Sequence, residues 1–122
     1  MDVINVIQAE HKVWARKNFG PPEDRNPLHP ILGVGEETGE LMHAVLKRDQ
    51  KIRGTPLKHT MEMHDAIGDI VIFLMDICNQ EGVELTDVVY DTWQGVKQRD
   101  WTTERSRNAF TRKAKASDSA PA

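Results

Sequence analysis

Acidic side chains at helical spacing are the residues of this chain best suited to chemistry. Glu36, Glu37 and Glu40 lie in one segment, and Asp65 and Asp69 lie in a second segment further along. Residues three or four positions apart lie on the same side of a helix, one turn from each other. If two such helices face each other, the carboxylates must be hydrated, protonated or neutralised by a cation. Because oxygen ligands alone suit Mg²⁺ or Mn²⁺ rather than zinc, the spacing predicts a magnesium site between paired helices.

The second acidic segment belongs to a strongly apolar part of the chain. Glu62, Asp65, Asp69 and Asp76 fall within an arc of roughly 60° on a helix of about 100° per residue. Nearly all other residues from Ile67 to Cys78 are apolar, which is typical of a central, buried helix. The acidic stripe is therefore expected to face a cavity or a charged partner.

Hydrophobic periodicity predicts four helices and indicates no strands. The expected helices cover residues 2–19, about 30–48, about 58–80, and about 85 into the segment 97–101. A proline-rich loop, 20–30, and a polar connection, 49–56, separate the first three. The apolar face of the second helix is expected at Val34, Leu41, Met42, Val45 and Leu46, and the inward side of the fourth at Leu85, Val88, Val89, Thr92 and Val96.

Composition limits the class of protein. The chain has 122 residues and a net charge of −3, which fits one domain and gives no overall attraction to nucleic acid. Cys78 is the sole cysteine, so a reducing compartment and a cytoplasmic location are expected, and neither a membrane span nor a secretory signal is evident. We expect a helical domain over 1–104 and a basic, disordered tail over 105–122.

Each candidate also has an ordinary structural explanation. The three glutamates alone could be a solvated helix face near an N-terminus, where acids suit the helix dipole. Asp65 and Asp69 are harder to explain in this way, because aspartate is a poor helix former and its neighbours here are apolar. Considered together, the two segments favour a metal site over surface decoration.

Possible substrate-binding residues flank the acidic segments. Lys97 and Arg99 could favour a helix C-terminus, or could hold the outer phosphates of an anionic substrate. Trp14 and Trp101 are typical of core or interface positions, with base stacking as the alternative. The residues that bracket the proline-rich loop, Phe19 and His29, are candidates for a nucleobase pocket.

Other catalytic arrangements have weaker support. Glu40 and His43 form a Glu-x-x-His pair, but a di-iron bundle needs a second copy, which the sequence lacks. Apolar neighbours raise the pKa of a thiol, so Cys78 is a poor nucleophile. The chain has no glycine-rich phosphate loop of the Gly-x-x-x-x-Gly-Lys type.

The combined motifs resemble a known family. They are Glu36-Glu37-x-x-Glu40, Gly68-Asp69-Ile70-Val71, Lys97-x-Arg99-x-Trp101 and Trp14-x-x-x-Asn18-Phe19-Gly20. This pattern, over roughly residues 5–101, is similar to the MazG-like branch of the all-α nucleoside triphosphate pyrophosphohydrolases. The resemblance implies a four-helix, all-α bundle assembled as a homodimer or dimer of dimers. It also implies Mg²⁺-dependent cleavage of a nucleoside triphosphate to monophosphate and pyrophosphate, with Mn²⁺ as a possible substitute.

The resemblance also implies roles for individual residues. Glu37, Glu40 and Asp69 would be metal ligands, and Glu36 would assist, for example by orienting the water. The family places a glutamate three residues before the aspartate, where this chain has Ala66. Asp65 is the first choice to replace it as a catalytic metal ligand, and Glu62 is the second. If neither binds metal, the protein would bind nucleotide without hydrolysing it.

Two functions of other classes remain as alternatives. The first is a non-catalytic helical dimer that binds nucleotide or a protein partner. The second is a DNA-associated protein that uses the basic residues of the tail, which predicts strongly salt-dependent binding. Those residues are Arg105, Arg107, Arg112, Lys113 and Lys115.

Overall fold

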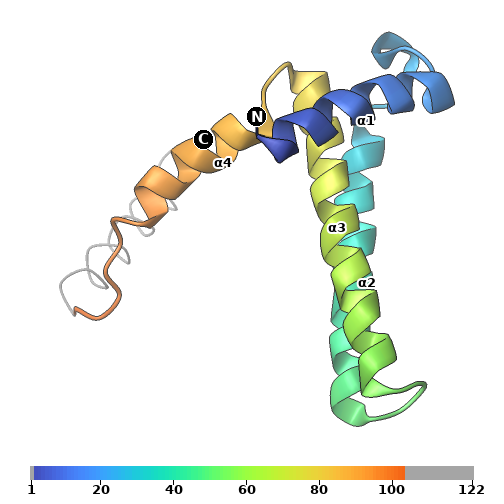
Figure 1. Cartoon of the computed structure of the whole chain (residues 1–122), viewed down its shortest axis with the longest axis vertical. Helices are drawn as coiled ribbons and strands as arrows, with labels where there is room; N and C mark the ends of the chain where they lie inside the picture. The colour runs from blue at the N-terminus through green and yellow to red at the C-terminus, as the bar shows by residue number, and fades with distance from the viewer. Residues whose placement is uncertain (1, 104–122) are drawn as a thin grey trace, which may run out of the picture. The chain divides into compact units, whose positions relative to one another are not determined.

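The described part of the chain, residues 2–103, is helical and contains no strand in this computed structural model (Figure 1). This confirms the prediction of an all-α fold. Its elements are α1 (Val3–Phe19), the short 3-10 helix η1 (Pro22–Asp24), α2 (Leu28–Gln50), α3 (Pro56–Glu81) and α4 (Leu85–Val96). The chain divides into two compact units, Met1–Val88 and Val89–Ala122, which are described separately below.

A side-chain cap accounts for where α1 begins, whereas α2 begins after a turn that contains Asn26. The side chain of Asp2 accepts a hydrogen bond from the backbone N–H of Ile4 at 2.9 Å, so α1 begins at Val3. The side chain of Asn26 accepts the N–H of Leu28 at 2.9 Å. Helix α2 begins at Leu28, slightly before the expected start near Pro30, and its N-cap residue, Pro27, makes no side-chain cap hydrogen bond.

Capping residues also mark both ends of α3. Thr55 accepts a hydrogen bond from Lys58 N–H at 3.1 Å, and Pro56 occupies the first helical position, where its missing N–H has no cost. Gly82 ends the helix in the left-handed conformation, with φ 72°. The helix therefore runs slightly beyond both predicted ends.

Helices α2 and α3 form an antiparallel hairpin (Figure 1). Near the connecting loop, Arg48 donates a hydrogen bond to Thr60 at 3.2 Å. The small side chains of Ala44 and Ala66 are buried between the helices, with exposures of 1% and 2%. The hairpin therefore places the two acidic segments of the sequence on neighbouring helices.

A buried glutamine joins α1 to the end of α3. Gln8 is 2% exposed, and its side-chain amide donates to Asn79 Oδ1 and to the carbonyl of Val83, both at 2.9 Å. Its side-chain oxygen accepts the N–H of Leu85 at 2.8 Å, so α1 supplies a cap for the first turn of α4. Met75, Cys78 and Leu85 form a small apolar cluster at this junction.

The prediction that α3 is buried on most sides is wrong for the single chain. Ile67 and Ile72 of α3 are 49% and 42% exposed, and Met42, Val45 and Leu46 of α2 are also exposed. In a hairpin each helix covers only one side of its neighbour, so the other apolar sides stay open.

The predicted inward side of α4 is also mostly uncovered. Leu85 is buried, whereas Val88 and Val89 are 43% and 56% exposed. After α4, Arg99 N–H bonds to the carbonyl of Val96 at 3.0 Å, and the chain leaves the helix before Trp101. The predicted tail, 105–122, lies outside the described residues. Among residues 2–103, none of the helices combines the length and the apolar character needed to cross a bilayer.

Candidate metal centre

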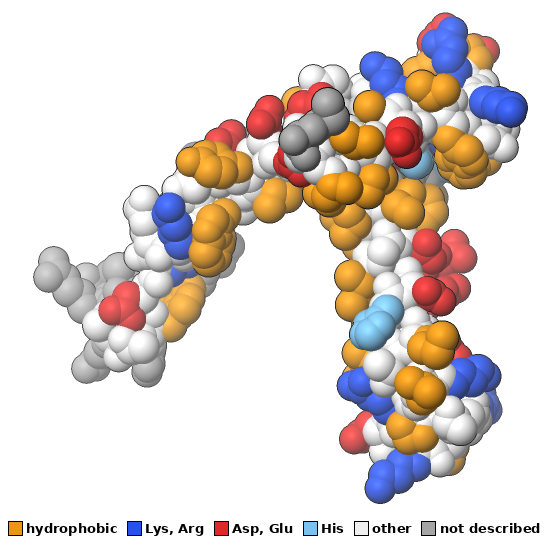
Figure 2. All heavy atoms as spheres, in the orientation of Figure 1, with side chains coloured by type: hydrophobic (Ala, Val, Ile, Leu, Met, Phe, Trp, Pro, Cys, Tyr) orange, Lys and Arg blue, Asp and Glu red, His pale blue; other side chains and the backbone are white. Residues whose placement is uncertain are grey.

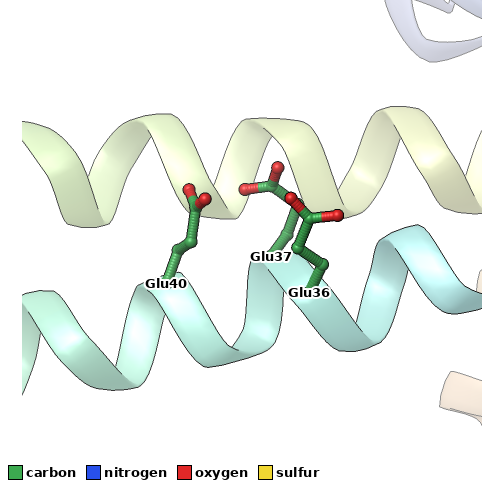
Figure 3. Close-up of side chains that lie close together, drawn as sticks. All are labelled: Glu36, Glu37 and Glu40. Carbon is green, nitrogen blue, oxygen red and sulfur yellow. The ribbon is translucent and has the colours of Figure 1, made fainter.

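Three glutamates of α2 come together on the hairpin. Glu36, Glu37 and Glu40 each offer a carboxylate oxygen within 4.8 Å of the others. Figure 3 shows their side chains extending from α2 toward the side on which α3 lies. In the space-filling view, acidic side chains gather midway along the hairpin (Figure 2). The three glutamates of α2 therefore lie together, as their spacing predicted, but among the described residues this group of carboxylates does not include Asp65 or Asp69 of α3.

Glu37 is the most constrained member of the cluster. It is half-buried, and its Oε2 is buried with no hydrogen-bond partner. Burial raises the pKa of Glu37, and the negative charges of Glu40, Asp69 and Glu36 raise it further. An unsatisfied carboxylate surrounded by others gains a favourable partner if a cation or a proton occupies the site.

The charge of Asp69, on α3, also acts on Glu37 of α2. Its charge acts on Glu37 more strongly than the charge of Glu36 does, although it lies on the other helix. Asp69 is therefore close enough to influence Glu37, although its carboxylate is not part of the group formed by the three glutamates of α2. A set of carboxylate oxygens without sulfur or imidazole fits a hard cation such as Mg²⁺ or Mn²⁺.

The residues proposed to replace the missing glutamate have different environments. Asp65 is exposed, one turn before Asp69. Glu62 is engaged within its own helix, where Lys58 lies 3.7 Å and His59 lies 3.5 Å from its carboxylate. Ala66 is buried in the hairpin. Asp65 is the more accessible of the two, and its choice over Glu62 stays a prediction.

Asp76 has a charged partner, which is one of the two surroundings expected for the acidic arc of α3, although the sequence did not identify that partner. Its carboxylate is paired with the guanidinium of Arg25, through hydrogen bonds of 2.9 and 2.6 Å. Asp76 therefore differs from the other acidic residues of the α3 arc, because a cation from outside α3 neutralises it. Burial raises the pKa of Asp76, but the hydrogen bonds and charge of Arg25 outweigh it, so that the pKa is lowered. A lone arginine in a proline-rich loop and a lone aspartate in an apolar segment were the available signals.

Aromatic rings gather beside this ion pair. Phe19 lies over the Arg25 guanidinium, 5.4 Å from ring centroid to the central carbon, and Trp14 meets Phe19 edge-on with centroids 5.5 Å apart. His11, a second residue missed in the sequence, lies 5.6 Å from Trp14. Its Nδ1 is buried without a partner, and burial lowers its pKa, with Asp76 acting in the opposite direction.

The other four predicted substrate residues lie outside α1. His29 is exposed in the first turn of α2. Lys97, Arg99 and Trp101 belong to the second unit, beyond the end of α4, and all three are exposed. The structure thus brings together Trp14 and Phe19 of the six substrate-binding candidates.

Comparisons with known proteins add no assignment: no family model matches the chain, and neither a curated protein nor a solved structure matches it.

Proposed function

We propose that the protein is a Mg²⁺-dependent nucleotide pyrophosphohydrolase that cleaves a (d)NTP to a (d)NMP and pyrophosphate. The observation that carries the proposal is the orphaned Oε2 of Glu37 within the group of three α2 glutamates, where the charge of Asp69 on α3 also acts. The resemblance of the acidic motifs to the MazG-like family supplies the reaction class. The cytoplasm, where cysteines such as Cys78 remain reduced, is the proposed setting.

The carboxylates would act by holding the metal. Glu37, Glu40, Asp69 and Asp65 would bind Mg²⁺, and Glu36 would orient a water for attack on the α-phosphorus. When bound, Mg²⁺ screens the triphosphate, acidifies water and stabilises the leaving pyrophosphate. Without this screening, the same carboxylates would repel an anionic substrate.

Binding of the substrate would use residues outside the cluster. Lys97 and Arg99 would contact the β- and γ-phosphates, since cationic donors bind phosphate oxygens strongly. Phe19, Trp14 and His29, with Trp101, would contact the base. The edge-on pair of Trp14 and Phe19 offers exposed aromatic surface of the kind that stacks on a base.

We further propose that two copies of the chain associate through the exposed apolar side of the hairpin, as a homodimer or as half of a dimer of dimers. An open groove on α2 is lined by Leu41, Met42, Val45 and Leu46, with charged residues at one end. Contiguous apolar surface of this kind marks interaction sites. A second hairpin would bury it and complete a four-helix bundle, in which each helix has two neighbours.

The alternative is a non-catalytic helical dimer that binds nucleotide or a protein partner. Ala66 favours it, because a methyl group stands where the resembled family has a metal-binding carboxylate. If neither Asp65 nor Glu62 compensates, the site would hold its ligand without turnover.

One assay separates these functions. The purified full-length protein is incubated with each common NTP and dNTP and with Mg²⁺, and the release of pyrophosphate is measured. Hydrolysis of at least one nucleotide, abolished by EDTA and restored by Mg²⁺, is expected. Binding of nucleotide without pyrophosphate release across the whole panel would instead establish the non-catalytic alternative.

A further inference from the structure

Gly33 of α2 packs directly against the ring of Phe73 on α3. A Cβ atom added at this glycine would lie 2.5, 2.6 and 2.7 Å from three atoms of the Phe73 ring. Carbon atoms in ordinary contact are about 3.5–4.0 Å apart, so any side chain here would overlap the ring by roughly 1 Å. The other glycines in the middle of α2, Gly35 and Gly39, have no neighbouring atom within 4 Å of an added Cβ.

This contact adjoins the acidic cluster on both helices. Gly33 lies one turn before Glu37 on α2, and Phe73 lies one turn after Asp69 on α3. The helices are antiparallel, so one turn along the hairpin leads from the contact of Gly33 with Phe73 to the level of Glu37 and Asp69. A change in the spacing of the helices at Gly33 is therefore transmitted directly to the two carboxylates.

We infer that Gly33 and Phe73 are positioning residues, which set the separation of Glu37 and Asp69 that a divalent cation requires. This inference rests on the proposed metal site and adds the contact that sets the distance between its ligands. Mg²⁺ binds oxygen at 2.0–2.1 Å in a nearly octahedral arrangement, so it tolerates little change in ligand spacing. Glycine is a poor helix former, and its presence within α2 at this layer is explained by the space that the ring occupies.

The test compares two alanine substitutions in the same helix. Gly33→Ala adds a methyl group against Phe73, whereas Gly39→Ala adds the same group in open space and serves as the matched control. Mn²⁺ is the probe, and its binding to each full-length protein is titrated by electron paramagnetic resonance. All titrations are made at a temperature where circular dichroism shows the protein fully folded.

Gly33→Ala is expected to weaken Mn²⁺ binding by at least about tenfold, the size of effect seen when the support of metal ligands is altered. Gly39→Ala is expected to bind Mn²⁺ like the wild type. In Gly33→Ala/Phe73→Leu the ring that causes the overlap is removed, so Mn²⁺ affinity should return toward the wild-type value. The rescue distinguishes positioning of the ligands from a general loss of stability.

Two other outcomes count against the inference or its premise, and a third is decided by the double variant. If Gly33→Ala binds Mn²⁺ as tightly as the wild type does, the inference is overturned while the metal site stands. If the wild type itself binds no Mn²⁺, the proposed function fails as well. If Gly33→Ala does not fold, the double variant decides: wild-type affinity supports the role of the ring contact, and a folded double variant that binds no Mn²⁺ refutes it.

Discussion

Glu37 shows how a half-buried carboxylate among other carboxylates can oppose folding. Burial and neighbouring carboxylates raise its pKa above the ordinary value of 4.5. A raised carboxyl pKa means that the folded protein binds the proton more tightly than the unfolded chain does. The associated stability is present below the unfolded pKa of about 4.5 and is lost as the pH rises through the folded value. At neutral pH a bound cation would remove this penalty.

The substitution Glu37→Gln should therefore have opposite effects with and without metal. The metal-free variant should melt at a higher temperature than the wild type at pH 7.5, because the repulsion is gone. Addition of Mg²⁺ should raise the melting temperature of the wild type and leave that of the variant unchanged. Differential scanning calorimetry with Glu10→Gln, an exposed position on α1, as the control measures both effects. Equal stabilisation of wild type and Glu37→Gln by Mg²⁺ would exclude Glu37 as a ligand.

The proposed ligands on the two helices should be equally necessary for turnover. Glu40→Gln and Asp69→Asn each remove a negative ligand with little change in shape, and each should lower kcat by at least about a hundredfold, since the metal stabilises the charge of the transition state. Steady-state assays of pyrophosphate release, with circular dichroism to check folding, measure the loss. Normal turnover in Asp69→Asn would remove α3 from the site.

At the scale of elements, the proline-rich loop is fastened to α3 by the Arg25–Asp76 pair. Both side chains are largely buried, with 13% and 7% exposure. Arg25→Ala would leave the carboxylate of Asp76 buried without its partner, which typically destabilises a protein by about 3–5 kcal/mol. Urea unfolding should show this loss, and Arg53→Ala, an exposed position, should not.

The same pair makes stability depend on acidity in a defined direction. The pKa of Asp76 is lowered below 3.8, so its contribution is present above that pH and is lost as the pH falls through the folded value. Arg25→Ala should reduce this acid sensitivity together with the stability. If the variant unfolds with the wild-type midpoint at every pH, the pair contributes nothing to the fold.

The junction of α1, α3 and α4 depends on Gln8. Gln8→Ala would remove the acceptor of the Leu85 N–H and the donor to the side-chain oxygen of Asn79, at about 1–3 kcal/mol for each group left buried without a partner. Urea unfolding should show a clear loss of stability, with Gln50→Ala at the exposed end of α2 as the control. A loss below about 1 kcal/mol would mean that water replaces these bonds.

Local patterns predicted the elements and one side of the site, and long-range contacts explain what was missed. The periodicity around Glu36, Glu37 and Glu40 identified both the helix and the cluster, because all three lie within one helical turn. Arg25 was missed because its partner is far away in the sequence. The contact between Gly33 and Phe73 could not be predicted either, because it depends on how two helices pack and not on the local sequence around the glycine.

At the scale of the whole molecule, the single chain leaves large apolar side chains uncovered along α2 and α3. If two hairpins pair through the groove on α2, the purified protein should sediment as a dimer or tetramer. Met42→Glu/Leu46→Glu should shift it toward monomer, because burying unpaired charges is costly. Val13→Glu, on α1 outside the groove, is the control. A wild-type monomer at micromolar concentration, or a double variant that remains associated, would contradict the proposed assembly.

The central claim is that carboxylates of α2 and α3 hold one or more divalent cations between them. The most direct measurement is a crystal structure of the protein grown with Mn²⁺, with anomalous diffraction collected at the manganese edge. We expect a strong anomalous peak between Glu37, Glu40 and Asp69, at bonding distance from oxygens of both helices. A map without a peak there, with these carboxylates directed to separate regions of solvent, would contradict the account.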